Sequence, residues 1–522
     1  MFCYPVSKNN KKSAIGSTLR PFTGYREQDY LFTIQTSALH IGIIGAGIAG
    51  IASAIRLSAR GHAVTVFEAN PYPGGKLSQF EQEGYRFDAG PSLFTMPQYV
   101  DELFQVAGET AHDHFQYETI PVSCQYFWND GTDLTAWAER PKFAAEVREK
   151  LGVPGQTVET FLDKSRHKYE SAGRIFLEKS LHRLDTWLQP SVLKSLMQLP
   201  GFDLFSTMNQ VHEKTFAHPK LVQLFNRYAT YNGSNPYKAP GMLTIIPHFE
   251  HNVGVFYPEG GMHQITQSLF DLSVRQGVQY RFNSPVTRIV TAQGKANGLV
   301  AGGKTHPFDR IVSNMDVFFT YKHLLPDAPH PERILQQSKS TSALIFYWGI
   351  RREFPELDLH NIFFADDYRT EFETLEGGDM VDDPTVYVNI TSKYTPSDAP
   401  PGCENWFVMI NAPCDKGQDW PALIERVRTR TLQKLGKRLN VDLAPLIACE
   451  SVLEPRDIEH KTSSHLGALY GYSSNNRMAA FLRHPNFSRR LKGLHFVGGS
   501  VHPGGGIPLC LLSAKIMDAT MQ

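Results

Sequence analysis

The sequence predicts an α/β fold in which segments from the two ends of the chain build one domain. Near residue 40, a short apolar run leads into a glycine-rich turn and a helical pattern, and residues 493–521 repeat this order of strand, glycine loop and helix. Between these ends, strand-rich and helix-rich stretches alternate. Such alternation is typical of a parallel sheet covered by helices. We therefore expect a discontinuous domain of this kind and a second domain built on a mixed β-sheet.

The composition limits the classes of function. The 522 residues are enough for two or three domains, and 52 Lys and Arg residues balance 52 Asp and Glu residues, so no attraction to nucleic acid follows. No stretch is apolar enough to cross a membrane, and no His or Cys spacing indicates a metal site. Six dispersed cysteines indicate a reducing compartment, so we expect a cytoplasmic location. Residues 1–39 are basic and lack the apolar core of a secretory signal, which predicts a flexible leader.

The first expected elements lie in the stretch HIGIIGAGIAGIASAIRLSARGHAVTVFE. Residues 41–44 are uniformly apolar apart from one glycine, as in a buried strand. From Ile48 onward, apolar residues recur three and four positions apart, which predicts a helix that ends at Gly61. The run AVTVFE, residues 63–68, predicts a second strand directly after this helix.

Three glycines in the first turn have the spacing of a dinucleotide-binding motif. Gly45 permits the tight turn after the strand, and Gly47, next to Ala46, lets a pyrophosphate approach the backbone. Gly50 lets the helix pack close to the sheet, and the helix N-terminus offers N–H groups and partial positive charge to phosphates. Glu68 closes the second strand and can accept hydrogen bonds from ribose hydroxyls. Together these features predict a bound dinucleotide without a 2′-phosphate.

Two further motifs indicate which dinucleotide this is. PGGK, with Gly75 and Lys76, follows the acid, and YRFDAGPS, with Gly90 and Pro91, comes soon after. These motifs resemble those of the two-dinucleotide-binding-domain flavoproteins, the superfamily of amine oxidases and carotenoid desaturases. The resemblance implies a Rossmann-like FAD domain with Lys76 near the flavin phosphates, where the superfamily usually has Arg. It also implies that the backbone of Val286, in NSPVTRIV, pairs with the adenine.

The C-terminal stretch GLHFVGGSVHPGGGIPLCLLSAKIMDATM contains the most specific motif. A strand that ends at Gly499 and Ser500 leads into a glycine loop, and a helix begins around Gly506, Ile507 and Pro508. Proline is favourable at the start of a helix because its missing N–H would have no partner there. A flavin ring against this helix start would be stabilised in its reduced, anionic form by the positive end of the helix dipole.

Residues 41–522 resemble, in order, the bacterial-type carotenoid desaturases, the phytoene desaturase family. The run RYATYNGSNPYKAPGMLTIIPHFEHNVGVFYPEGGMHQI (227–265) is also characteristic of this family. Leu509 follows Ile-Pro at a position where the commonest phytoene desaturases have Gly. Leucine at this position is more similar to the 1-hydroxycarotenoid 3,4-desaturase branch. Ser500 stands where many related flavoproteins have an acid that contacts the ribityl chain.

The resemblance implies an FAD-dependent oxidoreductase acting on CH–CH groups, which introduces C=C bonds into an acyclic carotenoid, phytoene-type or 1-hydroxycarotenoid, during carotenoid biosynthesis. Such an enzyme has to position a C–H bond and exclude water. His502 and Glu250 are candidate bases. A locally bonded loop residue is the alternative for His502, and a salt-bridge partner is the alternative for Glu250. For His248 and His251 we expect structural roles.

A carotenoid substrate also implies contact with a membrane surface. The segment 173–208 mixes apolar and basic residues, so it is either a peripheral helical subdomain in the interface or a buried helical pair.

Two alternative functions remain: a carotenoid isomerase or oxidase of the same fold, and a non-catalytic lipid-binding escort protein similar to the GDP-dissociation inhibitors. Flavin absorbance would argue against the escort protein, and a red-shifted polyene spectrum would separate desaturation from isomerisation.

The complete pattern divides the chain into six segments: a flexible leader at 1–39, the first segment of the FAD-binding domain at 40–100, a helical and substrate region at 101–245, the second segment of the FAD-binding domain at 246–320, a substrate domain at 321–480 and the C-terminal segment of the FAD-binding domain at 481–522. We expect the three FAD-binding segments to meet in one domain.

Overall fold

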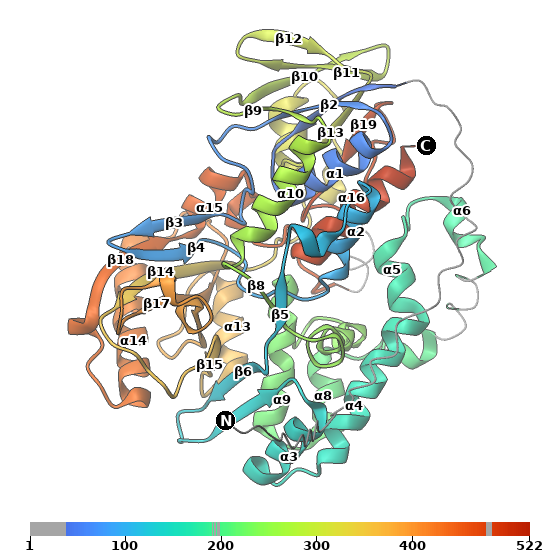
Figure 1. Ribbon diagram of the computed structural model, residues 1–522. Helices are drawn as coiled ribbons and strands as arrows, with labels where there is room; N and C mark the ends of the chain where they lie inside the picture. The colour runs from blue at the N-terminus through green and yellow to red at the C-terminus, as the bar shows by residue number, and fades with distance from the viewer. Residues whose placement is uncertain (1–37, 191, 193–194, 196–198, 477–482, 522) are drawn as a thin grey trace, which may run out of the picture. The chain divides into compact units, whose positions relative to one another are not determined.

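A five-stranded parallel sheet joins segments that lie far apart in the sequence (Figure 1). The computed structural model, which describes residues 38–190, 192, 195, 199–476 and 483–521, gives the strand order β19–β13–β1–β2–β9. The strands are β1 His40–Ile44, β2 Ala63–Phe67, β9 Gln279–Arg281, β13 Arg310–Ser313 and β19 Leu494–Phe496. All neighbouring pairs are parallel. The predicted α/β class is therefore confirmed, and the expected leader lies almost wholly outside the described residues.

The two faces of the parallel sheet have different covers. On one face, Ile41 and Ile43 pack in one buried cluster with residues of the helices α1 (Ile48–Ala59) and α16 (Ile507–Thr520). On the other face, Ile44 packs in a cluster with residues of a small antiparallel sheet. That sheet consists of β10 Val286–Ala292, β11 Lys295–Ala301 and β12 Lys304–Pro307. The sheet lies between these covers, so its strands are buried on both faces as the uniformly apolar β1 predicts.

A seven-stranded mixed sheet forms the second large layer. Its order is β18–β14–β17–β16–β15–β6–β7, and every pair is antiparallel except β15 and β6. The strands are β6 Val122–Phe127, β7 Asp133–Trp137, β14 Ser342–Ile350, β15 His360–Phe363, β16 Val386–Ile390, β17 Glu404–Ala412 and β18 Ile447–Leu453. The β3–β4 hairpin (Gln79–Gln82 and Tyr85–Asp88) packs on one face, and β5 (Tyr117–Thr119) pairs with β8 (Phe256–Pro258).

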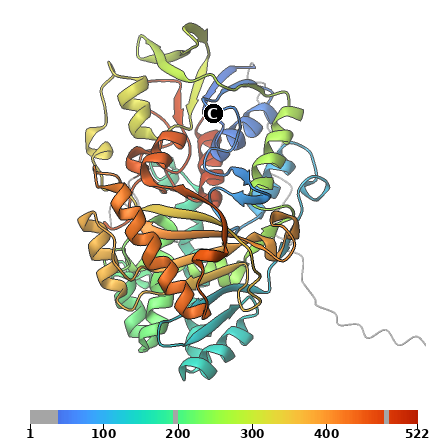
Figure 2. The same ribbon diagram turned by 90° about the vertical axis from the view of Figure 1, so that its left-hand side faces the viewer.

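The remaining helices cover the outside of these sheets. They are α2 Gln98–Val106, α3 Arg140–Leu151, α4 Gly155–Lys168, α5 Arg174–Glu178, α6 Leu184–Trp187, α8 Met208–Phe216, α9 Pro219–Asn226, α10 His263–Arg275, α11 Val317–Phe319, α12 Glu332–Leu335, α13 Tyr368–Gly377, α14 Trp420–Leu439 and α15 Pro455–Thr462. Figures 1 and 2 show β10–β12 at one end of the unit that begins at Leu39 and α3 and α4 at the other, with the seven-stranded sheet between them. Among the described residues, no helix is both long and apolar enough to span a bilayer.

Two regions contain detail that the sequence-based expectation lacks. Residues 101–245 are expected to be mostly helical, and they contain the strands β5, β6 and β7 in addition to their helices. The segment 173–208, expected to be helical, consists of short helical pieces in its described residues, which include α5 and α6. In the first region, β6 depends on long-range pairing, because its partner β15 is remote in sequence.

Candidate functional site

A cavity of about 1020 Å³ lies between the carboxyl ends of the parallel strands and one face of the seven-stranded sheet. In open parallel sheets, ligands bind at this end of the strands. The expected cofactor residues that line the cavity are Gly45, Gly47, Glu68, Gly75, Lys76, Gly90, Pro91, Val286, Gly499, Ser500, Gly506, Ile507 and Pro508. Ala46 and Gly50 are buried in the turn and helix behind this wall. The structure thus brings the predicted motifs to one cavity.

The first glycine turn is held by a carboxylate. The Ala46 N–H donates to Oε2 of Glu68 over 2.6 Å, and the Asn70 N–H donates to Oε1 over 2.9 Å. These bonds fix the Glu68 carboxylate at the end of β2, beside the start of α1. A Cβ on Gly50 would lie 2.2 Å from the Gly45 carbonyl oxygen, so only glycine allows this helix to begin so close to the turn.

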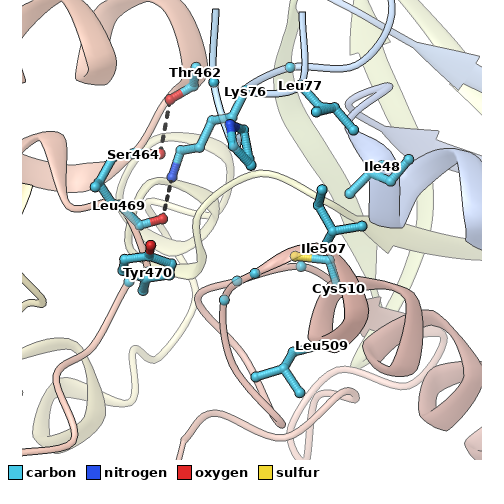
Figure 3. Close-up of a pocket in the computed structure, with 18 of the residues that line it drawn as sticks. Ile48, Lys76, Leu77, Thr462, Ser464, Leu469, Tyr470, Ile507, Leu509 and Cys510 are labelled. Carbon is cyan, nitrogen blue, oxygen red and sulfur yellow. Dashed lines mark hydrogen bonds between the residues drawn. The ribbon is translucent and has the colours of Figure 1, made fainter. Parts of the chain in front are cut away.

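Two cations, the buried Arg483 and the half-buried Lys76, line the cavity without a carboxylate partner among the described residues, and they test whether a phosphate group fits there. Nζ of Lys76 donates to the Leu469 carbonyl over 2.8 Å, and burial lowers its pKa to about 8 (Figure 3). Nη1 of Arg483 donates to the Tyr470 carbonyl over 3.1 Å, and burial lowers its pKa to about 10. Buried charges normally have partners, so the residues present fit a negatively charged group of a ligand.

The N-termini of α1 and α16 open onto the same cavity, and both N-cap residues are glycines, which have no side chain to cap the helix. In the first turn of α1, only the Gly50 N–H is recorded with a side-chain partner among the described residues, Oδ1 of Asn314 at 3.1 Å. Figure 3 shows Ile507 and Cys510 of α16 on the other side of the cavity from Lys76. The loop before α16 packs tightly, since a Cβ on Gly505 would lie 2.8 Å from the Tyr470 Cα. Backbone N–H groups at a helix start and a close backbone approach are what a dinucleotide requires.

The remaining residues of the C-terminal motif have internal partners. Oγ of Ser500 accepts a hydrogen bond from the Val317 N–H over 3.0 Å, at the start of α11. His502 is buried, and its Nε2 lies 2.9 Å from the Lys179 carbonyl, to which it donates. Burial lowers the pKa of His502 to about 3, so its imidazole is neutral and its lone pair is on Nδ1.

Glu250 lies at another wall of the cavity, in a buried hydrogen-bond network. Nη2 of Arg227 lies 3.2 Å from Oε1, the Tyr228 hydroxyl donates to Oε1 over 2.8 Å, and the Tyr231 hydroxyl donates to Oε2 over 2.5 Å. The nearby Arg227 guanidinium offsets the effect of burial and keeps the pKa of Glu250 below its usual value. The contacts of Glu250 are those of the salt-bridge alternative. His248 and His251 are also buried, and Nε2 of His251 contacts the Tyr228 hydroxyl over 2.7 Å.

The face of the seven-stranded sheet that lines the cavity is mostly apolar. Alternate residues of neighbouring strands contribute Ile345 and Tyr347 from β14, Ile362 from β15, and Phe407 and Met409 from β17. Side chains in a strand alternate between its two faces, so this periodicity creates a continuous hydrophobic wall. A cavity with such a wall and a few polar groups suits a largely apolar ligand.

Some cavity residues were not predicted from the sequence. Arg483, His360, Tyr368 and Tyr387 line the cavity, although none belongs to a glycine motif. They come from β15, β16, α13 and the described residues after 482, so only the tertiary structure brings them together. Arg227 is the first residue of the run at 227–265 that resembles the phytoene desaturase family. Its place in this run is a signal that could have identified Arg227 as a cavity residue.

Comparisons with known proteins agree with this geometry. The sequence matches the family described as flavin containing amine oxidoreductase over residues 48–517. It is 51% identical over 475 residues to a 1-hydroxycarotenoid 3,4-desaturase from Flavobacterium sp. (strain P99-3), covering 91% of this chain and 97% of that protein. It is 33% identical over 486 residues to a 4,4'-diapolycopene oxygenase from Methylomonas sp, covering 91% of this chain and 96% of that protein. The crystal structure of an oxidoreductase from Methanosarcina mazei has the same fold, with a TM-score of 0.60, 15% identity, and coverage of 93% of this chain and 100% of that one.

The parallel sheet, the glycine turn and the cation-lined cavity define a nucleotide-binding oxidoreductase, and the matched family specifies the cofactor as a flavin. The chain belongs to the flavin containing amine oxidoreductase family, and its cofactor is FAD. The predicted resemblance to carotenoid desaturases is confirmed by the 51% identity over most of the chain. The individual roles of the cofactor residues remain predictions.

Proposed function

We propose that the protein is an FAD-dependent carotenoid desaturase that acts on a 1-hydroxycarotenoid. The observation that carries this proposal is one cavity that joins the predicted FAD residues to a long apolar wall. The 51% identity to a 1-hydroxycarotenoid 3,4-desaturase supports the substrate class. Leu509, the residue that favoured this branch, also lines the cavity.

The residues that would hold FAD follow from the chemistry of each wall. Glu68 would accept hydrogen bonds from ribose hydroxyls, and Val286 would contact the adenine through its backbone. Lys76 and the start of α1 would bind the pyrophosphate. The start of α16 would lie against the ring. When bound, FAD supplies a two-electron acceptor for hydride.

The other tasks belong to the chain itself. Desaturation converts a C–C single bond into a double bond with loss of a hydride and a proton, and the conjugated chain spreads the positive charge. A strong base is therefore unnecessary. We propose His502 as the proton acceptor because its Nε2–H is bound to the Lys179 carbonyl and its Nδ1 carries the lone pair. The contacts of Glu250 favour a positioning role, since both of its oxygens accept hydrogen bonds.

The experiment that tests this function is incubation of the purified holoenzyme with an acyclic 1-hydroxycarotenoid. We expect a product that is lighter by two hydrogen atoms and has a red-shifted absorbance. An unshifted spectrum with altered isomer ratios would assign an isomerase instead. A product heavier by oxygen would assign the second candidate, an oxygenase, which the 33% identity to a 4,4'-diapolycopene oxygenase favours. A protein that binds no FAD would be consistent with an escort function.

We also propose that the protein binds peripherally to a cytoplasmic membrane surface, where a carotenoid is dissolved. Leu181, Leu177 and Phe176 line the cavity near α5, and Leu184 and Leu188 follow in the chain with 84% and 76% of their surface exposed. Exposed large apolar residues beside a hydrophobic cavity are typical of membrane contact. The five described cysteines are free thiols, as in a reducing compartment.

A further inference from the structure

We propose that a buried polar patch in the cavity recognises the hydroxyl group of the substrate and thereby determines which C–C bond is oxidised. The polar patch consists of Ser123, Arg227, His360 and Tyr368, which all line the cavity. This inference rests on the proposed function, which it deepens by naming the residues that select the 1-hydroxy end. No predicted cofactor residue belongs to the patch.

Each member of the polar patch carries a buried polar atom without a hydrogen-bond partner in the described part of the chain. These atoms are Oγ of Ser123, Nε of Arg227, Nε2 of His360 and the hydroxyl oxygen of Tyr368. The four residues are at most 6% exposed, and they come from four separate elements. Buried polar groups are nearly always satisfied in native proteins, so four such atoms on residues that line one cavity indicate a ligand that satisfies them.

His360 carries a hydrogen-bond donor that no described residue uses. Its Nδ1 accepts from Nδ2 of Asn389 over 3.2 Å and lies 2.7 Å from the Tyr387 hydroxyl. Burial lowers the pKa of His360 to about 4, so the ring is neutral and carries its single proton on Nε2. That N–H has no acceptor among the described residues.

Arg227 is held rigidly, and one donor remains unused. Its Nη1 donates to the Tyr231 hydroxyl over 2.8 Å, and its Nη2 donates to the Tyr126 hydroxyl over 2.6 Å and pairs with Glu250. Nε is the nitrogen without a described partner. The carboxylate of Glu250 neutralises the guanidinium, so the patch offers oriented donors rather than net charge. Such a site suits a neutral oxygen atom better than an anion.

The donor and acceptor balance of the patch matches an alcohol. The N–H groups of Arg227 and His360 can only donate, and they fit the lone pairs of a hydroxyl oxygen. The hydroxyl groups of Ser123 and Tyr368 can also accept, and they fit its proton. A pure hydrocarbon end would leave all of these buried groups unsatisfied, which disfavours binding.

The position of the patch connects it to the expected cofactor wall. Oγ of Ser92, next to the predicted Gly90–Pro91 motif, lies 2.8 Å from the Tyr387 hydroxyl, which contacts His360. In a 1-hydroxycarotenoid, a single carbon separates the hydroxyl-bearing C1 from the 3,4 bond. An alcohol bound at the patch therefore holds this bond, and no bond further along the polyene, next to the patch.

The test compares two substrates that differ only in the 1-hydroxyl group. We expect Tyr368→Phe and His360→Phe each to lower kcat/KM of the holoenzyme for the hydroxylated chain by about fivefold to tenfold, the loss of one hydrogen bond. Activity on the unhydroxylated chain should stay the same or rise. Tyr472→Phe is the matched control, because this tyrosine is also buried with an unpartnered hydroxyl among the described residues but does not line the cavity.

Two results would overturn the inference. An equal loss on both substrates would show that the patch has only a structural role or binds water. Unchanged kinetics in both variants would show that the alcohol binds elsewhere. Binding of each polyene to the holoenzyme, followed by the shift in polyene absorbance, separates this test from the proposed function. A protein that desaturates neither chain refutes the proposed function. A binding preference for the hydroxylated chain that Tyr368→Phe removes still supports the patch.

Discussion

At the scale of single residues, cavity-lining cations without carboxylate partners among the described residues are the clearest structural sign of the cofactor. Lys76 and Arg483 lie on the cavity wall and donate only to backbone carbonyls or neutral groups among the described residues. Burial alone makes each charge unfavourable, which is why their pKa values are lowered. A bound pyrophosphate would raise these pKa values again, because its negative charge stabilises the charged forms of both side chains. The two positive charges therefore become favourable when the ligand binds.

The first prediction concerns Lys76. Replacing Lys76 by Met should weaken FAD binding by about 10- to 100-fold, because one charge-assisted hydrogen bond contributes about 1.5–3 kcal/mol. Titration of FAD-free protein with FAD, followed by flavin fluorescence, measures the change. Lys304→Met is the control, since this lysine is exposed on β12 outside the cavity. Equal affinities for the Lys76→Met variant and the unmodified protein would contradict the assignment.

The second prediction concerns pH. In the FAD-free protein, burial lowers the pKa of Lys76 from 10.5 to about 8, while Asp316 acts in the opposite direction. The lysine is charged below pH 8 and neutral above it, so the Kd for FAD should rise between pH 7 and pH 9. Burial raises the pKa of the Cys510 thiol, which interacts electrostatically with Lys76, to about 11, so this thiol stays neutral in the same window. The same titration with Lys76→Met should show no such rise, and a rise of equal size would implicate another group.

The same shift has the opposite sign for stability. Without FAD, the unfolded chain keeps the Lys76 proton up to about pH 10.5, whereas the folded chain loses it near pH 8. The unfolded state therefore binds more protons in this window, and the contribution of this lysine to the unfolding free energy increases with pH. The affinity for FAD and this contribution to the stability of the FAD-free protein thus change in opposite directions above pH 8.

The third prediction concerns Gly90. A Cβ at this position would lie 1.8 Å from the carbonyl oxygen of Lys76, which is backbone and cannot move without displacing the loop. Gly90→Ala should therefore destabilise the protein by about 1–3 kcal/mol and release FAD. Gly377→Ala is the control, since its Cβ would meet nothing within 4 Å. Thermal unfolding and flavin content measure the outcome, and a variant with normal melting and full flavin would refute this account.

At the scale of elements, the sequence predicted the helices and strands that a local pattern of glycines and apolar residues marks. β1, α1, β2 and α16 have glycines at the turns and apolar spacing along their length, and they form within a few residues of the expected positions. β6 and β7 were missed because their stability comes from pairing with each other and with β15, which is remote in sequence. Glycine spacing could predict one wall of the site in the same way. The polar patch could not be predicted, because its four residues lie in separate elements and only the tertiary structure brings them to one cavity.

The fourth prediction concerns α6 and Leu188, the residue that directly follows it. Replacing both Leu184 and Leu188 by Ser should weaken binding to phospholipid vesicles at least tenfold, because each leucine that enters the interface contributes about 1.5–3 kcal/mol. Val274→Ser on α10 is the control, since this residue is also exposed but remote in sequence. Vesicle flotation measures binding, and the soluble activity on detergent-dispersed substrate should remain. Unchanged flotation of the double variant would place the membrane contact elsewhere.

At the scale of the whole molecule, the cavity is lined by segments from the first strand to the last helix, so its ligand connects nearly all layers of the fold. The fifth prediction is that removal of FAD lowers the melting temperature by several degrees, and that added FAD restores it. At a concentration 100 times Kd, a ligand stabilises the folded state by about 2.7 kcal/mol. Differential scanning fluorimetry at increasing FAD concentration measures this. A melting temperature that does not depend on FAD would contradict a site shared by these segments.

The place of β19 in the parallel sheet has a consequence for biosynthesis. β19 follows nearly the entire chain, yet it pairs with β13, which itself pairs with β1 near the start of the unit. The parallel sheet is therefore incomplete until residues 494–496 have been synthesised. The full set of predicted FAD contacts, which needs the start of α16 as well as the β1–α1 turn, forms only after that point.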